Sequence, residues 1–220
     1  MDAYVITLRG DRYSERVAQR CVDTGMDVGG VDVKIHPAVP AKDARRLMET
    51  YGIAWTWGKG GGGMNHHSYG GSDDARIGCA LSHLELWMAA NFYQKPILIL
   101  EHDAVFVKKF EPISFKSACM INDPRGATPR GEYWHSVMQK QGPGVWPKTR
   151  IFDDSRPDGL AGGSAYVINP KAAKRLLELV SEHGLWPNDA MLCRQFIPDL
   201  EQHYPYITEV RAEKSTIDVR

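Results

Sequence analysis

The feature that most constrains the fold is an unbroken aliphatic run that ends in charged residues. Residues 97–100 (ILIL) are followed directly by Glu101, His102 and Asp103. A strand that is apolar at every position is typical of a sheet covered on both faces, as parallel sheets are. Ligands of such sheets bind beyond the carboxyl ends of the strands. The sequence therefore predicts an α/β fold with two carboxylates and an imidazole at its binding edge.

The amino-terminal residues predict a strand, a helix and a second strand in succession. Residues 3–8 (AYVITL) have the composition of a buried strand. Tyr13, Val17 and Cys21 then recur at four-residue spacing, and Gly25 is expected to end the helix. Residues 31–39 (VDVKIHPAV) form the next expected strand. Because no hairpin turn joins these strands, a right-handed βαβ unit with parallel pairing is predicted.

Composition narrows the functional class. The chain has 220 residues, of which 43% are hydrophobic, and 27 Lys and Arg balance 27 Asp and Glu. This length can bury a core, and the neutral balance gives no overall positive field for nucleic acid. The four cysteines form no Cys-x-x-Cys pair, which favours free thiols in a reducing compartment. With no signal peptide and no transmembrane segment in the sequence, a soluble, cytoplasmic protein is expected.

A helix is predicted from Ser72, whose side chain would cap it. Two stripes at helical spacing follow. The stripe expected to face the core is Ile77, Leu81, Leu84 and Met88, and the stripe beside it is Arg76, Ala80, His83 and Trp87. The second stripe suits either an ordinary surface or the wall of a ligand site.

The remaining segments give weaker predictions. Residues 58–71 hold many glycines and predict a mobile loop, either a linker or a lid over a site. Residues 122–157 predict irregular chain with a short strand at 149–152 (TRIF). A strand and a helix starting at Pro170 follow, and a further helix start with Asn188 or Asp189 near its cap.

Several chemistries compete for these residues. Glu101 and Asp103 could hold a divalent cation, or they could simply surface into water. His66 and His67 lack cysteine partners, which argues against zinc. The glycine loop lacks the Gly-Lys-Ser/Thr ending of a Walker loop, and no Gly-x-Ser-x-Gly elbow is present. From position alone, Asp189 is equally a helix cap and a general base.

Seven segments occur in an order that resembles one enzyme family. They are VITLRGDRYSER, IHPAV, RIGCALSHLELW, LILEHDAVF, GLAGGSAYVINPKAAKRLLE, PNDAML and STI. Together they resemble glycosyltransferase family 25, the lipooligosaccharide- and collagen-galactosyltransferase family, from Tyr4 to Ile217. The Gly-Cys-x-x-Ser-His helix followed closely by the acidic strand end is the most specific part.

The resemblance implies a fold and a reaction. The fold would be GT-A-like, a Rossmann-type mixed sheet flanked by helices in a single domain over residues 1–220. Residues 1–110 would form the nucleotide-sugar-binding half and residues 111–220 the acceptor-binding half. The enzyme would transfer a sugar from a nucleotide-diphosphate donor, UDP-linked by preference, to an acceptor hydroxyl by inverting displacement. Manganese or magnesium would be the cation, and a glycan or lipid-linked saccharide the acceptor.

The resemblance also assigns residues. The family's Glu-Asp-Asp motif corresponds to Glu101, His102 and Asp103, with His102 in place of the central acid. Glu101 and Asp103 would bind the metal, and Asp189, in a Pro-x-Asp-x-x-Leu element, would be the catalytic base. The donor-binding set is Thr7, Arg12, Arg76, His83, Glu101 and His102, in which the arginines suit diphosphate by their forked geometry. The acceptor-binding set is Gly162, Gly163 and Trp186.

Two alternatives stay open at this point. One is a nucleotide-sugar- or glycan-binding module without turnover, suggested by His102. The other is a glycosyltransferase that acts on modified DNA, because residues 125–150 combine arginines with aromatic residues that could stack on bases. Because the net charge is neutral, modified DNA is ranked second, after a glycan or lipid-linked acceptor.

Overall fold

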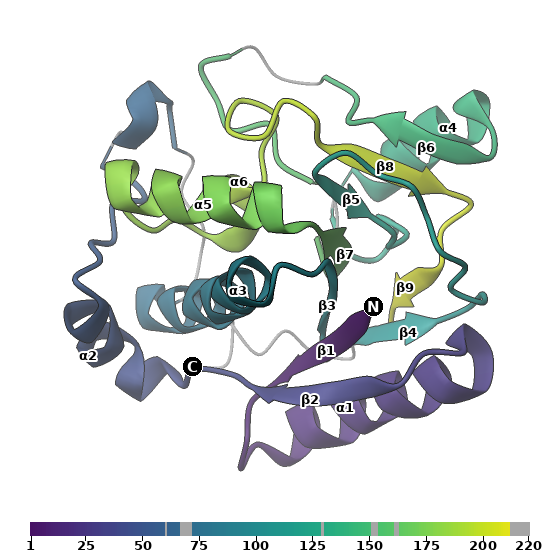
Figure 1. Cartoon of the computed structure of the whole chain (residues 1–220), viewed down its shortest axis with the longest axis horizontal. Helices are drawn as coiled ribbons and strands as arrows, with labels where there is room; N and C mark the ends of the chain where they lie inside the picture. The colour runs from purple at the N-terminus through teal and green to yellow at the C-terminus, as the bar shows by residue number, and fades with distance from the viewer. Residues whose placement is uncertain (60, 67–71, 129, 151–153, 161–162, 212–220) are drawn as a thin grey trace.

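The protein is described by a computed structural model for residues 1–59, 61–66, 72–128, 130–150, 154–160 and 163–211. In these ranges a seven-stranded sheet of order β2-β1-β3-β7-β5-β8-β6 lies between helices (Figure 1). Its strands are β1 (Asp2–Thr7), β2 (Val33–Pro37), β3 (Ile97–Glu101), β5 (Ala118–Met120), β6 (Gly144–Pro147), β7 (Ala165–Ile168) and β8 (Glu201–Tyr204). A small sheet pairs β4 (Ala104–Phe106) with β9 (Thr208–Val210).

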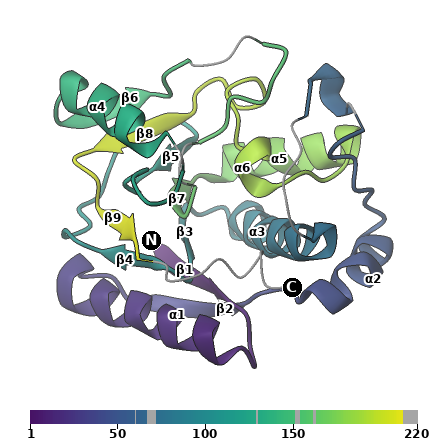
Figure 2. The same ribbon diagram turned by 180° about the vertical axis from the view of Figure 1, so that it is seen from behind.

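The helices cover both faces of the sheet. They are α1 (Arg12–Thr24), α2 (Ala41–Tyr51), α3 (Asp73–Tyr93), α4 (Gly131–Gln141), α5 (Pro170–His183) and α6 (Asn188–Met191). In both views α1 lies on one side of β1 and β3, while α3 and α5 lie on the other (Figure 2). The predicted α/β class, a Rossmann-type mixed sheet flanked by helices, is confirmed.

The central strand is buried as its composition predicts. Ile97 and Ile99 belong to the core shared with α3 and α5, whereas Leu98 and Leu100 belong to the core shared with α1. Alternate side chains therefore meet apolar partners on opposite faces of the sheet. This double coverage explains why no polar residue interrupts the run.

Strand directions place several carboxyl ends at one edge. β1 pairs in parallel with both β2 and β3, which confirms the predicted βαβ unit. β3 and β5 each pair antiparallel with β7, and β8 pairs in parallel with β5. The strands β1, β2, β3, β5 and β8 therefore all run the same way. They come from both halves of the chain, and the division into donor and acceptor halves stays a prediction.

The predicted end of the first helix at Gly25 is confirmed, because α1 ends at Thr24 and Gly25 is its C-cap residue, but a π-helical turn that was not predicted follows. The chain continues through a π-helical turn, Gly25–Gly29, and leaves it at Gly30 with φ of 65°. A Cβ atom at Gly25 would lie 2.6 Å from Cγ2 of Val33. Gly25 is therefore explained by close packing against the second strand, and Gly30 supplies the left-handed turn.

The two stripes of α3 are both largely buried. Ser72 caps the helix as predicted, since its hydroxyl accepts from the amide of Ala75. Met88 is 45% exposed, so its predicted core position is wrong. Arg76, Ala80, His83 and Trp87 are buried, so the surface interpretation of their stripe is wrong. The reason is that α3 packs against α2 and α5 as well as the sheet.

The prediction of irregular chain between residues 122 and 157 is partly wrong. Helix α4 and strand β6 both fall in this segment. The buried face of α4 is narrow, with Trp134 and Met138 one turn apart, and glycines flank it on both sides. At the predicted TRIF strand, residues 149–150 have no regular structure and 151–152 lie outside the described residues.

Other predictions are met or lie partly outside the described residues. Helix α5 starts at Pro170, and Asn169 caps it through the amide of Ala172. All four cysteines are free thiols. Of the glycine-rich segment 58–71, residues 60 and 67–71, including His67, lie outside the described residues. Among the helices described, none is both long enough and apolar enough to cross a bilayer.

Candidate active site at the carboxyl edge of the sheet

The acidic motif lies at the carboxyl edge of the parallel strands. Glu101 is the last residue of β3 and pairs with Ile6 of β1, while Asp103 lies in the turn that leads to β4. The amide of Glu101 donates to the carbonyl of Ser164, which fixes the strand end against the chain entering β7. The aliphatic run thus delivers the two acids to the edge where ligands bind in open α/β sheets.

Helix α3 approaches this edge closely because of Gly78 and Ser82. A Cβ atom at Gly78 would lie 2.4 Å from the carbonyl oxygen of Val39. The hydroxyl of Ser82 donates to the carbonyl of Gly78 and accepts from the amide of Val39, at 2.7 and 2.9 Å. One side of the Gly-Cys-x-x-Ser-His element therefore holds the chain that follows β2. Two other residues of this element, Cys79 and His83, lie next to Glu101 at the end of β3.

Cys79, His83 and Glu101 bring their polar atoms together. The thiol sulfur, an imidazole nitrogen and a carboxylate oxygen all lie within 4.8 Å of one another. Nε2 of His83 is 3.5 Å from Oε1 of Glu101. The thiol of Cys79 donates to Oδ1 of Asn188 at 3.6 Å, and Asn188 also hydrogen-bonds Glu101. Helices α3 and α6 thus meet the end of β3 at one polar cluster.

A cavity of about 130 Å³ adjoins this cluster. Cys79, His83, Glu101 and His102 line it on the polar side. Its apolar side consists of Ile6, Leu8, Ala38, Val39, Ala41 and Ala75, from the ends of β1 and β2 and the starts of α2 and α3. A cavity therefore lies at the carboxyl edge of the sheet, next to Glu101.

The two acids of the motif differ in their electrostatic setting. Burial raises the pKa of Glu101, but the neighbouring His83 imidazole and the other nearby charges outweigh it, and the net pKa lies below its usual value. Burial, and then the charge of Glu101, raise the pKa of Asp103 from 3.8 to about 7. Oδ1 of Asp103 is buried with no hydrogen-bond partner among the described residues. An added cation would relieve this repulsion.

Stability without a cation is expected to fall as pH rises from about 4 to about 7. The pKa of Asp103 is higher in the folded state, so folding favours its protonated form. That contribution is complete below the unfolded pKa of 3.8 and is lost above about 7. Chemical unfolding of wild type and Asp103→Asn across this range measures it. Parallel pH profiles for the two proteins would contradict the assignment.

Asp189 lies on α6, beside the cluster. Its charge, like those of Glu101 and Asp103, raises the pKa of the Cys79 thiol, after the larger effect of burial. Gly163 lies against it, since a Cβ there would be 3.9 Å from Cβ of Asp189. The predicted capping role is wrong, because the cap position is Pro187 and no side chain caps this helix. The cap interpretation thus loses its basis, and the base interpretation stays a prediction.

The predicted donor-binding residues do not all line one cavity in the structure. Thr7 is buried at the end of β1, where its carbonyl accepts from Ala38. Arg76 is buried on α3 with an ion pair to Asp73 at 3.4 Å. His102 lines the cavity, and burial lowers its pKa. Arg12 is exposed at the first residue of α1 and is not among the residues lining the cavity.

The predicted acceptor residues differ in access. Trp186 is fully buried, and its indole donates to Thr56 Oγ1 at 2.8 Å. His66 packs against its ring with centroids 4.4 Å apart. An acceptor could therefore stack on Trp186 only after these neighbours moved. Gly163 is half-buried beside Asp189, and Gly162 lies outside the described residues. The acceptor assignments stay predictions.

Three residues of the site were not predicted. Asn188 hydrogen-bonds both Cys79 and Glu101, and Tyr166 accepts from Trp87 Nε1 at 2.9 Å while its hydroxyl lies 2.8 Å from His83 Nδ1. Cys79 itself was quoted only as part of the helix motif. Its four-residue separation from His83, which places both on one helix face, was the available clue.

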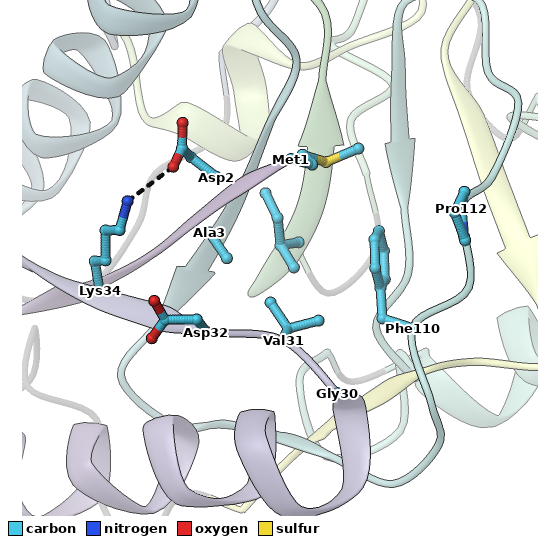
Figure 3. Close-up of a pocket in the computed structure, with 10 residues that line it drawn as sticks. Met1, Asp2, Ala3, Gly30, Val31, Asp32, Lys34, Phe110 and Pro112 are labelled. Carbon is cyan, nitrogen blue, oxygen red and sulfur yellow. Dashed lines mark hydrogen bonds and ion pairs between the residues drawn. The ribbon is translucent and has the colours of Figure 1, made fainter.

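A second cavity lies at the opposite edge of the sheet. It has a volume of about 470 Å³ and includes Met1, Asp2 and Leu98, near the amino ends of β1 and β3. Figure 3 shows the apolar side chains of Val31 and Phe110 among the residues that line it. Lys34 forms an ion pair with Asp2 at 2.8 Å at its side. The acidic cluster and this cavity are therefore on opposite edges.

Comparison with known proteins finds solved structures of low similarity and no curated relative. A search of curated proteins finds no match to this chain. Mouse xyloside xylosyltransferase 1 in its apo form aligns with TM-score 0.43 and 9% identity, over 92% of this chain and 83% of that one. The galactosyltransferase LgtC, in complex with donor and acceptor sugar analogues, aligns with TM-score 0.41 and 13% identity, over 92% and 73%.

The family comparison falls on the site itself. Residues 72–125 match the model described as glycosyltransferase family 25 (LPS biosynthesis protein). That range contains helix α3 with Cys79 and His83, and the strand end with Glu101 and Asp103. The resemblance stated from the sequence is confirmed over this range, where the chain is similar to glycosyltransferase family 25.

Proposed function

We propose that this protein is a glycosyltransferase that moves a sugar from a nucleotide-diphosphate donor, UDP-linked by preference, to an acceptor hydroxyl at the carboxyl edge of the sheet. The observation that carries the proposal is the half-buried pair of Glu101 and Asp103, in which the two carboxylates repel each other and one oxygen of Asp103 has no hydrogen-bond partner among the described residues. Such a pair beside a cavity suits a divalent cation. Manganese or magnesium there would neutralise charge on the leaving diphosphate.

Part of the donor would enter the cavity beside α3, which at about 130 Å³ is too small to hold a whole nucleotide sugar. The polar side of the cavity presents His83, Glu101 and His102, and its apolar side could cover a base or ribose. Arg76, buried on the same helix, is the proposed contact for a phosphate oxygen because a guanidinium pairs with phosphate in a forked geometry. Thr7 at the end of β1 is the further proposed donor residue, and Arg12 is a peripheral one.

Asp189 is the proposed general base. The carboxylates of Glu101 and Asp103 would be committed to the cation, so the proton of the acceptor hydroxyl needs another acceptor. Asp189 is half-buried on α6, near enough for its charge to act on Cys79. A base on the side opposite the leaving group would give inversion at the anomeric carbon. The proposed acceptor is a glycan or lipid-linked saccharide near Gly163, with modified DNA ranked second.

A screen of nucleotide sugars tests the proposal. We expect one donor, with manganese or magnesium present, to raise the melting temperature and to be hydrolysed slowly without an acceptor. Binding to the folded state at about 100 times Kd adds about 2.7 kcal/mol of stability. The parent nucleoside and a sugar phosphate serve as controls, because each lacks half of the donor. A full panel that neither shifts the melting temperature nor turns over would contradict the proposal.

A further inference from the structure

We propose that Cys79, His83 and Glu101 form a second metal site, selective for a zinc-class ion, which shares Glu101 with the proposed Glu101–Asp103 pair and differs from it in the ligands Cys79 and His83. A thiol, an imidazole and a carboxylate meet within 4.8 Å. This combination matches the ligand types of zinc, whereas magnesium and manganese favour oxygen ligands. The three residues come from α3 and the end of β3.

His83 is the first support for the site. Its side chain has no exposed surface, and its Nε2 has no hydrogen-bond partner among the described residues. The 3.5 Å from Nε2 to Oε1 of Glu101 is long for a hydrogen bond. It is close to the separation of roughly 3.3–3.5 Å expected between nitrogen and oxygen ligands of one tetrahedral zinc ion. An ion between these atoms would satisfy both.

The orientation of the His83 ring is already fixed from its other side. Nδ1 lies 2.8 Å from the hydroxyl of Tyr166, and that hydroxyl also accepts from Trp87 Nε1. Metal-binding histidines are commonly held this way through the nitrogen that does not bind the metal. The Tyr166 contact occupies Nδ1 and places Nε2 on the side of Glu101, and in the tautomer in which Nδ1 donates to the Tyr166 hydroxyl, Nε2 has a lone pair for a metal.

Cys79 supplies the third ligand and the selectivity. It precedes His83 by one helical turn, so both side chains leave the same face of α3. Metal binding would replace the S–H bond by a metal–sulfur bond and release the proton to solvent. Asn188, which now accepts from this thiol, would keep its hydrogen bond to Glu101.

The cavity gives the ion an entry path. All three ligand residues line the same space of about 130 Å³. Three protein ligands beside such a space leave a fourth position for water, as in zinc sites that are open to solvent. A purely structural hydrogen-bond network would have no need of this space.

Cobalt titration of the full, reduced chain tests the site. Cobalt replaces zinc and reports thiolate ligation by an intense charge-transfer absorption. We expect one equivalent to bind with that absorption, zinc to displace it, and excess magnesium to leave it unchanged. Cys79→Ala should abolish the absorption, and the matched control Cys119→Ala should keep it, since Cys119 is buried in the core on the other face.

Further variants separate this site from the proposed function. Glu101→Gln keeps the size of the side chain and should weaken cobalt binding at least about tenfold. Asp103→Asn should keep the absorption, because Asp103 is not a ligand here. The thermal melt of each metal-free variant checks folding, and Glu101→Gln carries the test if Cys79→Ala does not fold. Absence of the absorption in wild type, or its survival in Cys79→Ala, would overturn the proposal.

Discussion

Asp103→Ala is expected to reduce sugar transfer by at least about 100-fold while the protein stays folded. Changes even to residues that support metal ligands commonly cost 10–100-fold, and Asp103 is the proposed ligand itself. Folding should survive because the side chain lies in a turn, has an unpaired oxygen and repels Glu101. Steady-state transfer at saturating donor and manganese, with a thermal melt of the same preparation, measures both.

The control for this variant is an acid remote from the site. Asp32 is exposed and lines the cavity at the opposite edge, so Asp32→Ala removes one carboxylate without touching the motif (Figure 3). It should transfer sugar at the wild-type rate. Chelation should abolish wild-type activity, and added manganese should restore it. Full activity of Asp103→Ala, or of wild type in excess chelator, would rule out the metal role.

Asp189→Asn is expected to lower the transfer rate by about 10²–10⁴-fold, the usual contribution of a general base. The amide keeps the size of the side chain and loses only its basicity. Donor and cation should bind with near wild-type affinity, because neither is assigned to this residue. The effect should appear in kcat and not in the KM for donor, and a pH–rate profile should lose its acidic limb.

Asp158, in the segment RPDGLAGG, is another acid that could serve as the general base, and the structure gives it a different role. It is fully buried, with Lys148 Nζ at 3.0 Å and Arg194 Nε at 3.6 Å. Asp158→Asn would leave the buried ammonium of Lys148 without the opposite charge of Asp158, which typically costs about 3–5 kcal/mol of stability. We expect a lower melting temperature for that variant. Normal transfer by Asp189→Asn together with a folded, inactive Asp158→Asn would reverse the two roles.

The parts of the fold that the sequence predicts well are those set by local pattern. The aliphatic run before Glu101, the cap at Ser72 and the start at Pro170 each depend on neighbouring residues alone. Helix α4 escapes prediction because its buried face is narrow and glycines flank it. Met88 was wrongly predicted to be buried for a related reason, because helical spacing alone does not tell which residues of α3 lie beyond its packing partners.

The site is harder to predict because distant residues complete it. The acidic motif can be predicted from the sequence because it directly follows a buried strand. The contact of Cys79 with Asn188, 109 positions apart, depends on how α6 folds back over α3. Trp186 likewise looks like a sugar-stacking residue in isolation, yet His66 and Phe196 pack against its ring. Such contacts follow from tertiary packing, which spacing in one sequence does not encode.

Calorimetric titration of the nucleoside diphosphate, the proposed leaving group, tests the central claim most directly. The claim is that the acids at the end of β3 bind the donor diphosphate together with a divalent cation. We predict binding to wild type with manganese, and at least about tenfold weaker binding when manganese is omitted or Asp103 is changed to Asn. Equal affinity in all three titrations, or no binding to wild type with manganese, would contradict the account.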